Sequence, residues 1–162
     1  MKKLIIVLAL TLSFVTIASA QPRAIGARFG RSQLEASYQH SFHKGFIEAD
    51  LGLDLMAKGG FVLTGIYDFE FAHCNWTPRG EWTWYAGPGA TVGYVYNGNS
   101  DDSIVGAMAG LCGQLGLEYA FWFPLAISAD IRPTIGYHFG DSAIYKYNAF
   151  TFIPTISVRY RF

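Results

Sequence analysis

Strict alternation of polar and apolar residues runs through the stretch Glu48-Ala49-Asp50-Leu51-Gly52-Leu53-Asp54-Leu55. Successive side chains of a β-strand point to opposite faces. A strand here therefore places four aliphatic side chains on one face and three carboxylates on the other. A helix of the same residues would mix the two kinds of side chain on every face. The stretch predicts a β-strand with one apolar face and one charged face.

Alternation of the same kind recurs in seven further segments. They are Ile25–Phe29, Leu34–Phe42, Phe61–Phe71, Trp82–Tyr96, Val105–Phe121, Leu125–Phe139 and Phe152–Phe162. Turn residues separate them, as in Lys58-Gly59-Gly60 and Asn97-Gly98-Asn99. After residue 20 no apolar run is long enough for a membrane helix, and no window has the spacing of an amphipathic helix. The chain is predicted to be all-β, with eight antiparallel strands.

The two faces of these segments are inverted relative to a water-soluble sandwich, which has polar outer faces. Here the polar face carries most of the glycines and small residues, and the apolar face carries the bulk. Charged residues make up 15% of the chain, below the usual quarter, while 51% of residues are hydrophobic. The pattern predicts a closed eight-stranded up-and-down transmembrane β-barrel, a meander whose outer face contacts lipid. Closure is required because hydrocarbon offers no partner for an open sheet edge.

The N-terminal residues have the features of a secretory signal peptide. Lys2 and Lys3 precede an apolar run, Leu4–Ile17, which is shorter than the roughly 20 residues that span a bilayer. Small residues at Ala18 and Ala20 predict cleavage before Gln21. We therefore expect residues 1–20 to be removed on export and residues 21–162 to form the barrel domain.

Aromatic residues gather near both ends of the predicted strands, as expected for two membrane interfaces. One girdle comprises Phe42, Phe46, Phe69, Phe71, Trp82, Trp84, Tyr119, Phe121, Trp122, Tyr160 and Phe162. The other comprises Phe61, Tyr94, Tyr96, Tyr137, Phe139, Tyr145, Tyr147, Phe150 and Phe152. Between the girdles, the positions that face lipid are mostly aliphatic or small.

Charged residues on the polar faces are expected to form an ion-pair network inside the barrel. They are Arg28, Glu35, Glu48, Asp50, Asp54, Asp68, Glu70, Glu118, Asp130, Arg132, Arg159 and Arg161, with His138 as a further candidate. Because an eight-stranded barrel is just wide enough to be filled by side chains, the network predicts a plugged interior. A narrow ion path lined by the surplus carboxylates is the alternative.

Prolines at positions 88, 133 and 154 fall inside predicted strands, and each removes one ladder donor. We expect bulges or bends there, or strand boundaries that differ from those given above.

No catalytic, cofactor-binding or metal site is predicted. His40 and Ser41 face opposite sides of a strand, and His43 lies in a turn, so neither makes a convincing base for a serine nucleophile. His40, His43 and His73 lack the spacing of a metal site. Cys112 is expected to be a free thiol inside the barrel, with a disulfide to Cys74 as the alternative. Zero formal net charge excludes the basic surface of a nucleic-acid-binding protein.

The end of the chain, Thr155-Ile156-Ser157-Val158-Arg159-Tyr160-Arg161-Phe162, alternates strictly and finishes aromatic-x-aromatic. With the eight segments, it resembles the small OmpA- and OmpX-like porin-type outer-membrane barrels of Gram-negative bacteria. Stretches such as Tyr85-Ala86-Gly87-Pro88-Gly89 are similar to barrels of the Bacteroidetes group. No peptidoglycan-binding domain is expected after the barrel, in contrast to full-length OmpA.

The resemblance implies a place in the outer membrane, with membrane lipid and lipopolysaccharide as partners. Val158, Tyr160 and Phe162 would form the C-terminal signal that the barrel assembly machinery recognises. We expect a monomer, no cofactor and no nucleic-acid partner. The resemblance also implies that the N-terminus begins on the periplasmic side. A structural or surface-interaction role is the first functional hypothesis. A narrow porin-like channel and a lipid A-modifying enzyme are the alternatives.

Overall fold

The computed structural model describes residues 22–30, 33–54, 60–95, 106–139, 143–147 and 154–162. These residues form strand segments that pair antiparallel with their neighbours and contain no helix. The segments are β1 (Pro22–Phe29), β2 (Gln33–Phe42), β3 (Gly45–Asp54), β4 (Gly60–Cys74), β5 (Glu81–Val95), β6 (Gly106–Ala120), β7 (Leu125–Ile131), β8 (Thr134–His138), β9 (Ala143–Tyr147) and β10 (Thr155–Arg161). In the part of the chain described, no helix is long and apolar enough to cross a membrane. The predicted signal peptide, with Ala18, Ala20 and Gln21, lies outside the described residues.

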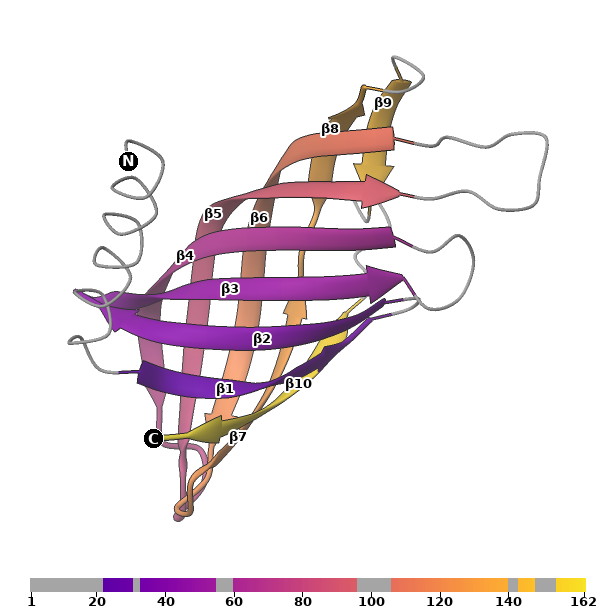
Figure 1. Cartoon of the computed structure of the whole chain (residues 1–162). Helices are drawn as coiled ribbons and strands as arrows, with labels where there is room; N and C mark the ends of the chain where they lie inside the picture. The colour runs from indigo at the N-terminus through magenta and orange to yellow at the C-terminus, as the bar shows by residue number, and fades with distance from the viewer. Residues whose placement is uncertain (1–21, 31–32, 55–59, 96–105, 140–142, 148–153) are drawn as a thin grey trace, which may run out of the picture.

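The ten described segments make eight strands. β7 and β8 both pair with β6 in one register, because Ile131 lies opposite Leu115 and Thr134 lies opposite Cys112. β10 pairs with β7, and β9 pairs with β8. β9 and β10 are therefore two segments of the last strand. β1 pairs with β10 and closes the wall, as Figure 1 shows. The prediction of an all-β, closed, eight-stranded antiparallel barrel is confirmed.

The register fixes the stagger of the barrel. A path drawn at right angles to the strands starts at Leu125 and returns to the same strand at Ile135, ten residues further on. In between it crosses Tyr160, Ile25, Tyr38, Ala49, Gly65, Ala90 and Leu111. Stagger of this size tilts the strands by roughly 40° and leaves an interior that side chains can fill.

Alternating burial shows which face of each strand is inside. In β10 the side chains of Thr155, Ser157 and Arg159 are buried, whereas those of Ile156 and Tyr160 are more than half exposed. On β6, Leu111 is 73% exposed while its neighbour Cys112 is buried. The charged and small residues therefore fill the centre of the barrel, and the aliphatic residues cover its outside.

The pairing with β6 has no bulge at Pro88 or Pro133, although the strand is interrupted at Arg132 and Pro133. Pro88 lies in an unbroken ladder with β6, opposite Gly113. Pro133 divides β7 from β8, yet the register with β6 is the same on both sides of it. A proline removes only its own N–H, and the carbonyl of Pro133 still accepts a hydrogen bond from Gly113 N at 3.1 Å. Pro154 immediately precedes β10 and is not part of it, and the predicted strand residues 152–153 lie outside the described part of the structure.

The described pairings have register shifts at two other places, and Pro22 borders one of them. Register shifts lie between Pro22 and Ala24 in the pairing of β1 with β2, and between Glu70 and Ala72 in the pairing of β4 with β5. Both positions are near the end of the barrel that carries the start of β1 and the end of β10. The first shift turns Arg23 toward the interior mouth of the barrel.

Candidate functional site: the charged interior

Arg132 joins the two opposite sides of the interior. It lies at the break between β7 and β8, and its guanidinium donates to Glu48 at 2.9 Å, to Glu35 at 3.3 Å and to Asp50. Its Nε donates to the side-chain oxygen of Gln114 at 2.7 Å. Every guanidinium nitrogen of this buried arginine therefore has an acceptor, which offsets the cost of removing the charge from water.

Arg28 forms a second cluster near the closing seam. Its Nη1 donates to Glu35 at 2.7 Å, and its Nη2 donates to Asp130 and to the hydroxyl of Thr155 at 2.6 Å. The residues come from β1, β2, β7 and β10. Glu35 also contacts Arg132, so the two arginine clusters share a carboxylate.

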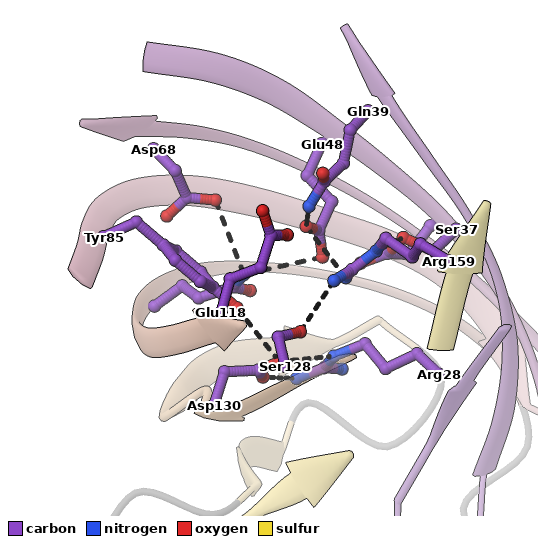
Figure 2. Close-up of polar contacts among 12 residues, drawn as sticks. Arg28, Ser37, Gln39, Glu48, Asp68, Tyr85, Glu118, Ser128, Asp130 and Arg159 are labelled. Carbon is purple, nitrogen blue, oxygen red and sulfur yellow. Dashed lines mark hydrogen bonds and ion pairs between the residues drawn. The ribbon is translucent and has the colours of Figure 1, made fainter. Parts of the chain in front are cut away.

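Arg159 is the most deeply buried cation, with 1% of its surface exposed. It donates to Glu48 at 3.0 Å, to Ser128 at 2.7 Å and to Ser37 at 3.1 Å. Gln39 donates to the same Glu48 carboxylate at 2.7 Å. Figure 2 shows these side chains converging from several strands on the carboxylate of Glu48 and on Ser128. Gln114 also donates to Glu48, at 3.4 Å, so two arginines and two amides bind this carboxylate.

Carboxylates outnumber guanidinium groups in this central part of the described interior. Glu35, Glu48, Asp50, Asp68 and Asp130 are buried together with Arg28, Arg132 and Arg159. Asp68 accepts a hydrogen bond from Gln114 at 3.4 Å, but its Oδ1 has no hydrogen-bond partner among the described residues. The same holds for Oδ1 of Asp50. The carboxylates of the described interior therefore have spare acceptor capacity.

Phe46 was predicted to be in an aromatic girdle, and the structure corrects this. Its side chain is completely buried inside the barrel, where its ring centroid lies 5.3 Å from that of Tyr85. The guanidinium carbon of Arg23 lies 4.0 Å over the Phe46 ring. The reason is parity, since residue 46 is on the same face of β3 as Glu48 and Asp50. Phe46 and Tyr85 form an aromatic layer that closes the interior toward the ends of the chain.

Tyr85 fits inside the barrel because position 116 on the neighbouring strand is a glycine. A Cβ atom at Gly116 would lie 2.3 Å from Cζ of the Tyr85 ring. Gly116 pairs directly with Tyr85 in the ladder between β5 and β6. The small residue therefore provides the space that the ring occupies.

Substitution of Gly116 by valine is expected to destabilise the barrel by about 3 kcal/mol, because the ring of Tyr85 must move in a filled interior. The cost should fall close to zero when Tyr85 is already alanine, since the competing ring is then absent. Urea unfolding of the two single variants and the double variant, followed by tryptophan fluorescence, measures this coupling. Equal costs of Gly116→Val in both backgrounds would show that the ring does not occupy this space.

Most charged residues expected inside the barrel are buried there. They are Arg28, Glu35, Glu48, Asp50, Asp68, Glu118, Asp130, Arg132 and Arg159, and His138 is buried as well. Glu70 and Arg161 lie at the mouth of the barrel, where both line an open pocket. The side chain of Asp54 lies outside the described part of the structure. Sequence reasoning missed Arg23, which pairs with Glu118 at 2.7 Å and Glu70 at 2.9 Å, because the bulge beside it breaks the alternation.

The histidines and cysteines do not assemble into one site. His40 lies 3.2 Å from the hydroxyl of Tyr38, and His43 is in the turn between β2 and β3. Within the ranges that the structure describes, no three or more His, Cys, Asp or Glu residues are placed to hold a metal ion. Cys74 and Cys112 are both free thiols, and Cys112 is buried.

The chain matches no known protein-family model, no curated protein and no solved structure.

Proposed function

We propose that the protein is an integral outer-membrane β-barrel with a plugged interior and a structural or surface-interaction role. The observation that carries this proposal is the inverted distribution of side chains in a closed barrel. Arginines and carboxylates fill the centre, while Leu51, Leu63, Val92 and Leu111 are about half exposed or more on the outside. In water such a continuous apolar surface is rarely tolerated, whereas in a bilayer it contacts acyl chains.

Aromatic residues at one end of the barrel support the same proposal. Trp76 and Trp122 are largely exposed, and ring contacts link Trp82 and Tyr119 at 4.6 Å and Tyr119 and Phe121 at 4.6 Å. Amphipathic aromatic rings of this kind prefer the level of lipid headgroups. Val158 and Tyr160 are exposed on the outer face of β10, and Phe162 is exposed just after it, so the assembly machinery of the outer membrane could bind these three residues. Under this proposal, membrane lipid and lipopolysaccharide are the partners of the outer surface.

The protein is expected to fractionate with the outer membrane and to migrate differently on SDS gels before and after boiling, because a closed barrel resists SDS until it is heated. Recovery in the soluble periplasmic fraction, together with unchanged migration on boiling, would overturn the proposal. Incubation with lipopolysaccharide followed by mass spectrometry should leave the acyl chains intact. Loss or transfer of an acyl chain would favour the lipid A-modifying enzyme instead.

No channel activity is expected from the folded protein. Arg132 and Arg159 both contact Glu48 across the interior. Phe46 and Tyr85 form a layer between these ion pairs and the end of the barrel that holds the start of β1. An ion that crosses must break these pairs in a space already filled by side chains. Planar-bilayer recordings of the folded barrel should therefore show no conductance steps. Discrete steps that disappear after heat unfolding would favour the narrow porin-like channel.

A further inference from the structure

An open pocket lies at the mouth of the barrel, at the end that holds the beginning of β1 and the end of β10. We call it the mouth pocket; it has a volume of about 600 Å³, within the range of pockets that bind small molecules. Its charged lining consists of Arg23, Glu70, His73, Glu81, Glu118 and Arg161. Arg23 lines the pocket and also covers Phe46, so the aromatic layer lies directly behind the pocket wall. The mouth pocket is therefore separate from the central ion pairs.

One wall of the mouth pocket contains a hydrogen-bond acceptor that has no partner. Oε1 of Glu118 binds Arg23 at 2.7 Å, but Oε2 of Glu118 has no hydrogen-bond partner in the described structure. The side chain of Glu118 is only 3% exposed, so water in bulk does not satisfy this oxygen. Glu70 binds the same Arg23 nitrogen at 2.9 Å, which places two carboxylates around one cation. The side chain of Glu70 is 25% exposed, so its carboxylate is the one of the two that can accept a hydrogen bond from an ammonium group in the pocket.

The same pocket wall contains arginines whose hydrogen-bond donors are not fully used. Arg161 makes no side-chain ion pair with any described residue, although it lines the pocket. Nη1 of Arg23 is buried and likewise has no acceptor among the residues described. A guanidinium binds a carboxylate through two parallel hydrogen bonds. The pocket therefore holds donors and acceptors that its own side chains do not satisfy.

We propose that the mouth pocket binds a small zwitterion of the α-amino-acid class, with its ammonium group against Glu70 and its carboxylate against Arg161. Three N–H donors of an ammonium group match the carboxylate wall, and the fork of Arg161 matches a carboxylate. Ala120 and Phe162 supply apolar lining for the ligand's side chain. A simple cation would leave Arg161 without an anionic partner, and a simple anion would be repelled by the glutamates.

Leucine, N-acetylleucine and leucinamide test the proposal, because they share a side chain and differ in one charged group each. The full-length protein, folded in a nonionic detergent, is titrated with each ligand by calorimetry. Leucine is expected to bind saturably, and each derivative about tenfold more weakly, because one charge-assisted contact is lost. Failure of leucine to saturate, or equal affinities for the three ligands, would overturn the proposal.

Two variants locate the groups. Glu70→Gln should reduce the preference for leucine over N-acetylleucine and keep the preference over leucinamide. Arg161→Gln should do the converse. Lys44→Gln removes a charge outside the pocket lining and should leave all three affinities unchanged. Glu70→Asp, which withdraws the carboxylate by one methylene group, replaces Glu70→Gln if that variant does not fold, and should reduce the same preference. Affinities that follow net charge alone, with Lys44→Gln acting like Arg161→Gln, would also overturn the proposal.

Discussion

Replacement of Arg132 by methionine is expected to reduce the stability of the barrel by at least 3 to 5 kcal/mol, roughly the cost of breaking a buried ion pair. Methionine keeps much of the side-chain length but leaves Asp50 without its arginine partner and removes one of two arginines from Glu48. These carboxylates are buried and cannot recover their hydration without opening the wall. Urea unfolding in detergent or lipid, followed by tryptophan fluorescence, measures the loss.

The matched control is Arg161→Met, the same substitution at the mouth of the barrel. Arg161 is half-buried and has no ion pair among the described residues, so its replacement should change stability by no more than about 0.5 kcal/mol. Asp50→Asn in the Arg132→Met chain should restore part of the loss, because the uncompensated charge is then removed. If Arg132→Met and Arg161→Met unfolded at the same urea concentration, the interior network would not stabilise the fold.

Gly26→Ala is expected to have the second large effect, because it acts where the barrel closes. Gly26 pairs with Arg159 across the seam between β1 and β10. A Cβ atom at position 26 would lie 2.0 Å from the carbonyl oxygen of Val158 and 2.6 Å from Cα of Arg159. Both contacts are with backbone, so a change of rotamer cannot relieve them. The two strands must separate, and we expect a loss of about 3 kcal/mol or more.

Ala27→Leu provides the control for this prediction. Ala27 is the next residue on β1 and pairs with Val158 on the outer face, where added apolar volume meets the surroundings of the barrel. Its substitution should change the free energy of unfolding by about 0.5 kcal/mol at most. The gel shift on boiling gives a second readout, since a seam that fails to close should also lose resistance to SDS. Unchanged unfolding and an unchanged gel shift in Gly26→Ala would contradict the close approach of the two strands.

Alternation of side chains was sufficient to predict the fold, because in a barrel of this kind one simple rule governs every strand. The same rule places Glu48, Asp130 and Arg159 inside. It would also have placed Phe46 inside if parity had been given more weight than aromatic character. Arg23 was not predicted to face the interior, because a bulge beside it changes the alternation of side chains. Bulges depend on contacts with the neighbouring strand.

The pairing of charges could not be predicted from the sequence. That Arg132 reaches Glu48 and Asp50 on β3, while Arg159 also reaches Glu48, follows from the stagger of ten residues around the barrel. Stagger is a property of the closed sheet as a whole, and the sequence of a single strand does not determine it. The mouth pocket was missed for the same reason, because its walls come from strands at both ends of the chain.

The sharing of Glu48 has a consequence for the order in which the chain can be assembled. Glu35, Glu48, Asp50 and Asp68 belong to the first half of the sequence, while Arg132 and Arg159 belong to the last third. During synthesis, the early strands emerge with acidic faces, and Arg28 is the one arginine of the central network that has been made by then. The negative charge of those faces is neutralised only when the strands that carry Arg132 and Arg159 are present. Electrostatics therefore couple maturation to arrival of the C-terminal strand, so that a prematurely terminated chain lacks the counter-charges needed to hold its acidic strands together.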